Sequence, residues 1–234
     1  MKSQRGRAAA AYRGVILVIS VCLSIRTAYS GQPDQNKPAG QEFKEIQAKA
    51  IKGDAGAQYV LGACYGYGKG VAKNEIEAAK WYRKAAEQGN ADAQYSMGWC
   101  YQNGEGVEGA TTEAVKWYRK AAEHGHILAQ YSLGWCCQNG AGMNKNLAEA
   151  VQWFTKAAEQ GHADAQYSVG WCYGNGQGVA TNCVEAYKWA VLAAGQGYED
   201  ARKLRDDMER RLKPDQVAEA RRLAEAIKSR LTPP

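Results

Sequence analysis

A repeat of 36 residues fills most of this chain and limits what it can fold into. The seven tryptophans lie 18 residues apart, at positions 81, 99, 117, 135, 153, 171 and 189. Whole segments recur with the 36-residue period. Examples are GNADAQYSMGWCYQNGEGV (89–107) and GHADAQYSVGWCYGNGQGV (161–179), which lie two periods apart. Periods of about 20–50 residues are typical of solenoids, propellers and arrays. We therefore predict four full repeats, over 53–88, 89–124, 125–160 and 161–196.

Each repeat is predicted to be two antiparallel helices joined by a glycine turn. In the first half of the second repeat, Ala93, Met97 and Cys100 recur at helical spacing and form one apolar face. In the second half, Trp117 lies on such a face with alanines. The turn at 103–107 has glycines where the backbone needs positive φ. Because no strand-like alternation is present, the predicted fold class is all-α, a solenoid of helix-turn-helix repeats.

Half repeats flank the array and are predicted to cap it. Residues 41–52 (QEFKEIQAKAIK) form the first cap, and residues 197–231 form the C-terminal cap. Pro214 stands where a last helix would begin, a position that proline favours. Residues 31–40 (GQPDQNKPAG) are polar and contain proline and glycine, so they are predicted to be a linker.

Residues 1–30 are typical of a secretory signal peptide. They contain five basic residues, no acidic residue and an uncharged run of twelve residues from Gly14 to Ile25. Twelve helical residues rise about 18 Å, less than a bilayer core of about 30 Å. Small residues at Ala28 and Ser30 predict cleavage before Gly31, and an uncleaved anchor is the alternative. We expect an exported protein, periplasmic or secreted, with no membrane insertion after cleavage.

The leader also accounts for most of the charge. The whole chain has a formal net charge of +6, and without the five basic residues of the leader the mature chain is left with +1. Proteins that bind nucleic acid or an anionic membrane usually present a positively charged surface, and a nearly neutral chain does not indicate one. Neither is therefore an expected partner.

The motif A-x-A-Q-Y-x-L-G-x-x-Y-x-x-G-x-G-V, followed by A-x-x-W-Y-x-K-A-A-E-x-G, resembles the Sel1-like repeat family, a relative of the tetratricopeptide repeat. The resemblance covers roughly residues 41–231. It implies a right-handed superhelix of helix pairs that acts as a scaffold for protein–protein contacts. We therefore expect a protein or peptide of unknown identity to bind in the concave groove, with no cofactor and no chemistry of the chain's own.

Aromatic residues on the first helix of each repeat are the candidates for this groove. Tyr95 and Trp99 lie about 40° apart around a helix, opposite the apolar face. By resemblance to tetratricopeptide arrays these positions line the concave surface, where aromatic rings can anchor a partner. The candidate residues are Tyr59, Tyr95, Trp99, Tyr131, Trp135, Tyr167 and Trp171, with Asn103 and Asn139. The alternative is that these rings pack between successive first helices.

The tryptophans of the second helices are predicted to belong to the core. Trp81, Trp117, Trp153 and Trp189 share a helix face with alanines.

The cysteines suggest structure more than chemistry. Cys64, Cys100, Cys136 and Cys172 recur at the repeat period on a core-facing position. Equivalent sites on neighbouring helices lie about 8–10 Å apart, whereas the Cα atoms of a disulfide lie within about 7 Å. Cys172 and Cys183 flank a single helical hairpin, so these two could form a disulfide.

The runner-up function is weak β-lactamase or penicillin-binding activity. It is carried over from one branch of the family, the Helicobacter cysteine-rich proteins, which join their helices by disulfides. The paired cysteines of that branch would fall at Gln94 and Ala122 here, so this chain departs from the pattern. It also has no S-x-x-K, no G-x-S-x-G and no Ser–His–Asp constellation. A purely structural role in a larger envelope assembly is the third possibility.

No metal site is predicted. The three histidines, His124, His126 and His162, lie at repeat junctions and are expected to face solvent. Neither C-x-x-C nor H-E-x-x-H supplies a metal-ligand spacing.

Overall fold

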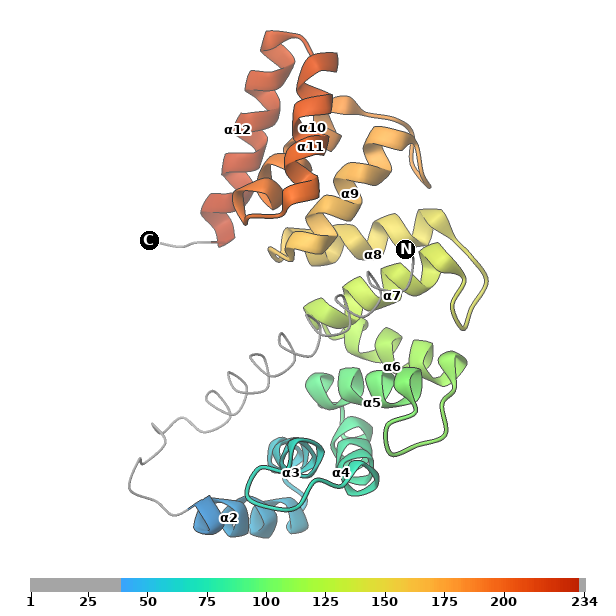
Figure 1. The fold of residues 1–234 in the computed structure, drawn as a ribbon, viewed down its shortest axis with the longest axis vertical. Coiled ribbons are helices and arrows are strands. Elements are labelled where there is room, and N and C mark those ends of the chain that lie inside the picture. Colours follow the sequence, from blue (N-terminus) through green and yellow to red (C-terminus); the bar gives the residue numbers. More distant parts are fainter. Residues whose placement is uncertain (1–38, 232–234) are drawn as a thin grey trace. The chain divides into compact units, whose positions relative to one another are not determined.

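The computed structural model describes residues 39–231, and every regular element in this range is a helix (Figure 1). The predicted all-α class is confirmed. The predicted signal peptide at 1–30 lies outside the described residues, and so does the linker apart from Ala39 and Gly40, with which the first described helix begins. The helices are α2 (Ala39–Ile51), α3 (Ala55–Tyr67), α4 (Glu75–Glu87), α5 (Ala91–Asn103), α6 (Thr111–Glu123), α7 (Ile127–Asn139), α8 (Leu147–Glu159), α9 (Ala163–Asn175), α10 (Cys183–Gly195), α11 (Glu199–Arg211) and α12 (Pro214–Leu231).

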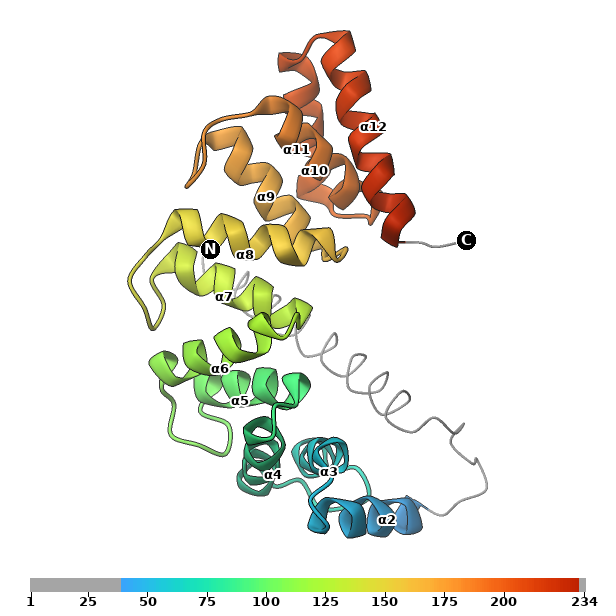
Figure 2. The same cartoon turned by 180° about the vertical axis from the view of Figure 1, so that it is seen from behind.

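The described chain divides into two compact units. The first contains residues 39–93 with 105–107, and in it α2 packs on α3 and α3 on α4. The second contains residues 94–104 with 108–231, and in it each helix from α6 to α10 packs on the next (Figure 1). Helix α12 packs on α10, as both views show (Figure 2). This nearest-neighbour packing is that of an α-solenoid, and the handedness of its superhelix stays a prediction.

Asparagines mark where second helices begin. An asparagine Oδ1 accepts the backbone N–H of a glutamate three residues later at 3.1 Å in α4, α8 and α10. Such a cap satisfies one of the N–H groups that the first turn of a helix leaves without a partner. The capping residues are Asn74, Asn146 and Asn182.

Two kinds of glycine hold the helices close together. Gly98 lies inside α5, where an added Cβ would come within 2.5 Å of the Tyr118 ring in α6. The absence of a side chain there lets the two helices of the repeat pack closely, as the sequence predicts. Gly178, in the turn after α9, has φ of +75°, and a Cβ there would lie 2.3 Å from the Leu147 carbonyl oxygen at the start of α8. This turn therefore packs directly on the preceding repeat.

Buried glutamines connect successive repeats. Gln166 in α9 is 1% exposed, and its Nε2 donates to the Ala158 carbonyl oxygen of α8 at 3.1 Å. Its Oε1 accepts a hydrogen bond from Nε2 of Gln196, which follows α10, at 2.9 Å. Gln130 makes the same pair of contacts one repeat earlier. Because both ends of each buried amide are paired, these polar side chains fix the register between repeats.

Candidate functional site

Three tryptophans of the second unit form the part of the candidate groove that reaches the surface. They occupy the same position on α5, α7 and α9, and we call them the tryptophan face: Trp99, Trp135 and Trp171. Trp99 and Trp135 are half-buried, and Trp171 is 37% exposed. A tryptophan that is not fully buried can cover a partner with a large, rigid ring. The structure therefore keeps these three residues as candidates.

The tyrosines of the predicted groove pack inside the units. Tyr59 and Tyr95 are 5% and 9% exposed. Their ring centroids lie 5.8 Å and 5.6 Å from those of Tyr82 and Tyr118, on the second helix of the same repeat. Placing Tyr59 and Tyr95 on the binding surface is therefore wrong, because the partner helix covers them.

The tyrosines of the third and fourth repeats are half-buried and also contact other rings. The Tyr131 ring lies 5.6 Å from Phe154 and is stacked on His162 at 4.8 Å. The Tyr167 ring is stacked on Tyr198 at 5.0 Å. Burial is the largest cause that raises the pKa of Tyr167 above its ordinary value. Tyr131 and Tyr167 are therefore partly covered by rings of their own repeat or the next one, and we do not count them in the tryptophan face.

The predicted asparagines end the helices of the tryptophan face. Asn103 and Asn139 are exposed, and each Nδ2 donates to the carbonyl oxygen of the tryptophan four residues earlier, at 2.9 and 2.8 Å. Asn175 does the same for Trp171 at 2.9 Å. Asn175 is absent from the predicted set, although its position in the repeat could have identified it.

The tryptophans of the second helices are covered to different degrees. Trp153 and Trp189 are 8% and 3% exposed, as predicted for core residues. Trp81 and Trp117 are only half-buried, so the prediction that they are core residues is not met in full. A lysine ammonium lies over each of the four rings at 4.0–4.8 Å, from Lys84, Lys120, Lys156 and Lys188. These rings are thus already occupied by cation–π contacts within the chain.

The disulfide suggested for Cys172 and Cys183 is not formed in the structure, where both are free thiols. Cys183 packs against the cluster of Tyr187 and Met208, and the α9 residue that meets this cluster is Tyr173. Cys172, one position earlier on the helix, is 2% exposed. Burial raises the pKa of its thiol to about 11, so it is not a reactive thiolate near neutral pH.

Two histidines are structural, against the expectation that they face solvent. His126 and His162 are half-buried and precede α7 and α9. Each Nδ1 accepts the backbone N–H of the residue three positions on, Ala129 or Ala165, at 3.1 and 3.2 Å. The sequence signal for this role was the position itself, which holds Asp54 and Asn90 in the preceding repeats.

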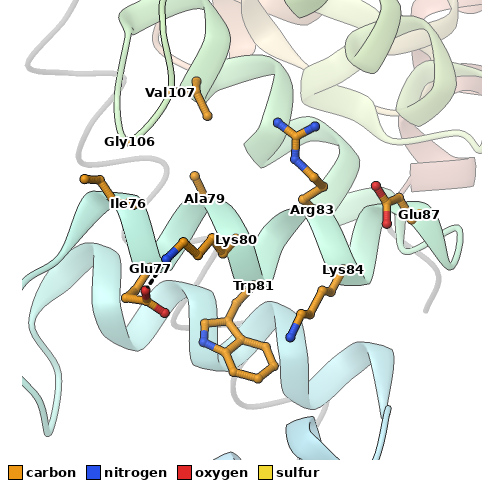
Figure 3. Close-up of a pocket in the computed structure, with 10 residues that line it drawn as sticks. All are labelled: Ile76, Glu77, Ala79, Lys80, Trp81, Arg83, Lys84, Glu87, Gly106 and Val107. Carbon is orange, nitrogen blue, oxygen red and sulfur yellow. Dashed lines mark hydrogen bonds and ion pairs between the residues drawn. The ribbon is translucent and has the colours of Figure 1, made fainter.

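A pocket of about 460 Å³ lies along α4 in the first unit (Figure 3). The turn residues Gly106 and Val107 approach it, and Ile76 beside them is 59% exposed. Its lysines are engaged within the chain: Lys80 forms an ion pair with Glu77 at 2.6 Å, and Lys84 lies over Trp81. No sequence motif indicates this pocket, because it depends on the approach of a turn to a helix that ends 19 residues earlier in the chain.

Within residues 39–231, no group of three or more His, Cys, Asp or Glu side chains could hold a metal ion. Each helix of this same part of the chain is too short or too polar to span a bilayer.

The Sel1 repeat matches the sequence four times, at residues 55–90, 91–126, 127–162 and 163–198. The chain belongs to the Sel1 repeat family. Each matched Sel1 repeat starts at the first residue of a first helix, two residues after the predicted repeat boundaries. Sel1 repeats form solenoids that generally serve as non-enzymatic scaffolds for protein–protein interactions.

Two solved structures support the Sel1 solenoid fold. A Sel1 repeat protein from Oxalobacter formigenes is 34% identical with a TM-score of 0.67, over 80% of this chain and 81% of that one. A protective antigen of uropathogenic Escherichia coli with an SLR fold is 29% identical with a TM-score of 0.58, over 93% of this chain and 54% of that one. No curated protein matches the sequence.

The runner-up activity gains no support from these likenesses. Cysteine-rich protein B of Helicobacter pylori is 24% identical over 55% of this chain with a TM-score of 0.44, too low to carry an argument. Gln94 and Ala122, the positions at which that branch would have paired cysteines, are both buried. Gln94 Oε1 lies 3.0 Å from Nδ1 of His124, which ends α6, so this site connects the two helices of the second repeat.

Proposed function

We propose that this Sel1 repeat protein is a scaffold that binds a protein or peptide segment on the tryptophan face. The observation that carries the proposal is the contrast in burial along the first helices. Tyr59 and Tyr95 are buried against the second helix of their own repeat, whereas Trp171 is 37% exposed. Trp99 and Trp135, at the equivalent positions of Trp171, are half-buried. Tryptophan is one of the residue types that most often dominate the binding energy of a protein interface.

The charge of these helices indicates what kind of contact is made. Helix α7 contains no charged residue, and α5 and α9 each contain one, Asp92 and Asp164. Salt bridges therefore contribute little on this face, and the partner is expected to present apolar or aromatic side chains. The affinity should accordingly depend weakly on ionic strength.

We also propose that the scaffold acts outside the cytoplasm. The basic leader, short apolar run and small residues of 1–30 support this. The N-terminal sequence of protein recovered from an envelope fraction tests the proposal, because processing should expose Gly31. Recovery of unprocessed protein in the cytosolic fraction would contradict it.

Site-specific photo-crosslinking tests the binding proposal. A photoreactive residue at Asn139, beside the tryptophan face, should form a discrete adduct in an envelope extract. One at Gln152, exposed on α8, is the control and should not. The adduct should disappear when Trp135 and Trp171 are both replaced by alanine.

A stability measurement separates this proposal from simple packing. The variant with alanine at both positions should keep its helicity, and its melting midpoint should fall only slightly. Trp153→Ala should lower the midpoint strongly, because Trp153 is 8% exposed. If the double variant melts as early as Trp153→Ala, the tryptophan face belongs to the core and the proposal fails.

A further inference from the structure

The residue that precedes each first helix differs from repeat to repeat, but in most repeats its side chain caps the start of that helix. In four of five junctions its side chain accepts the backbone N–H of the residue three positions on, and Tyr198, before α11, makes no such bond. Asp54 accepts at 2.6 Å, Asn90 at 2.8 Å, His126 at 3.1 Å and His162 at 3.2 Å. Only the two histidines use a nitrogen that can take up a proton near neutral pH.

Stacking fixes both imidazole rings. The His126 ring lies 4.7 Å from the Tyr95 ring at an interplanar angle of 19°. The His162 ring lies 4.8 Å from the Tyr131 ring at 23°. Each histidine thus connects the start of one first helix to the first helix of the preceding repeat. A ring held in this way cannot turn freely to offer its other nitrogen.

The hydrogen bond determines where the proton of each ring lies. A nitrogen that accepts an N–H bond carries no proton, so the neutral ring has its proton on Nε2. Protonation of Nδ1 would place a donor against the N–H groups of Ala129 and Ala165. It would also place a positive charge at the positive end of a helix dipole. Both effects oppose the folded junction.

The groups around His162 act in opposite directions. Burial, the largest cause, lowers the pKa of His162, and the carboxylate of Asp164 partly offsets this with Oδ2 at 4.0 Å from Nδ1. Burial, the largest cause, and the charge of the Asp164 carboxylate both raise the pKa of Tyr198, the residue that precedes α11. Tyr131 of α7 covers the ring face. The carboxylate nearest to His162 is therefore shared with a second group.

The junction at His126 differs from that at His162 in the first turn of the helix that follows. The first turn of α7 contains no acidic residue, and Leu128 takes the place of Asp164. Tyr95 of α5 covers the ring, and the neighbouring Gly125 carbonyl oxygen accepts a hydrogen bond from Gln160, which follows α8. The first turn of α7 therefore supplies no carboxylate that could stabilise a protonated His126.

We propose that the two histidine-capped junctions are proton-sensitive joints of the repeat array. Protonation of His126 and His162 removes the N-caps of α7 and α9, the helices that carry Trp135 and Trp171, and loosens these helices. For His162, whose pKa is lowered in the folded chain, the stabilisation is complete above the unfolded pKa of about 6.5. It is lost progressively as the pH falls below that value, because the unfolded chain then binds more protons. This effect on the fold does not depend on what the tryptophan face binds.

The third histidine of the chain is an internal control. His124 Nδ1 lies 3.0 Å from Gln94 Oε1, an acceptor, so Nδ1 of His124 donates. A protonated His124 can keep this bond. Its equivalents in the other repeats are glutamines that donate in the same way, Gln88, Gln160 and Gln196.

The experiment compares two variants built from residues that the chain itself uses. H126N/H162N puts the capping asparagine of position 90 at both junctions, and H124Q puts the glutamine of position 88 at the control site. We expect the melting midpoint of the unaltered protein to fall by about 4–8 °C between about pH 7.5 and pH 5.5. H124Q should keep this fall, and H126N/H162N should reduce it to less than about 2 °C.

Nuclear magnetic resonance provides the local readout. At about pH 7.5, Nδ1 should be unprotonated in His126 and His162 and protonated in His124. As the pH falls, protection of the Ala129 and Ala165 amides against hydrogen exchange should decrease in step with titration of the two rings, relative to the Ala93 amide capped by Asn90. An equal pH dependence in H126N/H162N, or titration without loss of amide protection, would overturn the proposal.

Discussion

The first repeat and the fourth repeat have the same buried residues between their helices, which we call the frame of a repeat. They differ at the end of the first helix. Ala57, Gln58 and Cys64 in α3 are buried, and so are their equivalents Ala165, Gln166 and Cys172 in α9. At the position of the tryptophan face, however, α3 has Ala63, which is 1% exposed, where α9 has Trp171 at 37%. Tyr67 stands where α9 has Asn175.

This difference shows that the frame and the face are separate features of a repeat. The frame is dictated by how the two helices of a pair and the next repeat pack, so its residues recur. The face is not needed for that packing, so it can change from repeat to repeat. A repeat without the tryptophan still forms both helices, as α3 and α4 show.

Removal of a frame side chain should have the largest effect. Phe154→Ala removes a ring that is 1% exposed and packs on Tyr131, and it should lower the free energy of unfolding by about 3–5 kcal/mol. Tyr82, at the same position of the first repeat, is 7% exposed, so Tyr82→Ala should cost somewhat less. Chemical denaturation of both variants measures the difference. Equal and small losses would mean that this position is not part of a shared frame.

Adding a side chain to the glycine turn that packs on the preceding repeat should cause the next largest loss of stability. Gly178→Ala combines a positive φ of +75° with a Cβ 2.3 Å from the Leu147 carbonyl oxygen, so we expect a loss of about 3 kcal/mol in stability. Gly140→Ala is the control, because its φ is +71° but its Cβ would meet no atom closer than 3.4 Å. It should lose only about 1–2 kcal/mol. Similar losses for both would show that the close contact between turn and helix does not matter.

A tryptophan placed in the first repeat should not extend the tryptophan face. Ala63→Trp inserts a large ring at a site that is 1% exposed, so it should overpack the first unit and destabilise it by about 1–3 kcal/mol. Thermal melting followed by circular dichroism measures this loss. Ala72→Trp is the control, since Ala72 is exposed in the turn after α3 and should accept the ring with little change. A stable Ala63→Trp protein that binds more tightly would contradict the separation of frame and face.

The smallest effect is expected at Cys172, a buried thiol of the frame, which should not react with an alkylating agent in the folded protein. Because burial raises the pKa of Cys172 to about 11, its thiolate fraction stays negligible below about pH 9. Iodoacetamide at about pH 8 should therefore leave Cys172 unmodified in the native protein and alkylate it after denaturation. Mass spectrometry of peptic fragments measures both. Rapid native alkylation would show that the fourth repeat opens more readily than its packing indicates.

The sequence was most informative where local rules decide the structure. The 36-residue period predicts the helix pairs, because a recurring apolar face needs a recurring neighbour. The glycine within α5 predicts a close helix contact, and Tyr118 makes it. The cysteines at the repeat period are buried thiols, as their core-facing position predicts.

The candidate site was predicted less well. Spacing around a helix places Tyr95 and Trp99 about 40° apart, yet one is buried and the other only half-buried. The difference arises because Tyr95 meets Tyr118 of α6 and His126 of the next junction. The capping role of the histidines could have been predicted from Asp54 and Asn90, which hold the same position in the preceding repeats. The stacking of each ring on a tyrosine of the preceding repeat could not, because it is a tertiary contact.

The sequence by itself thus determined the repeats, their helices and the family, since these follow from contacts within about one period of the chain. Only the tertiary structure decided which aromatic rings reach the surface and which histidines stack on a tyrosine of the preceding repeat. Period and angle define the side of a helix on which a residue lies, whereas exposure depends on what the neighbouring helix places over it. Trp171 and Ala63 share a position in the repeat, yet Trp171 is 37% exposed and Ala63 only 1%.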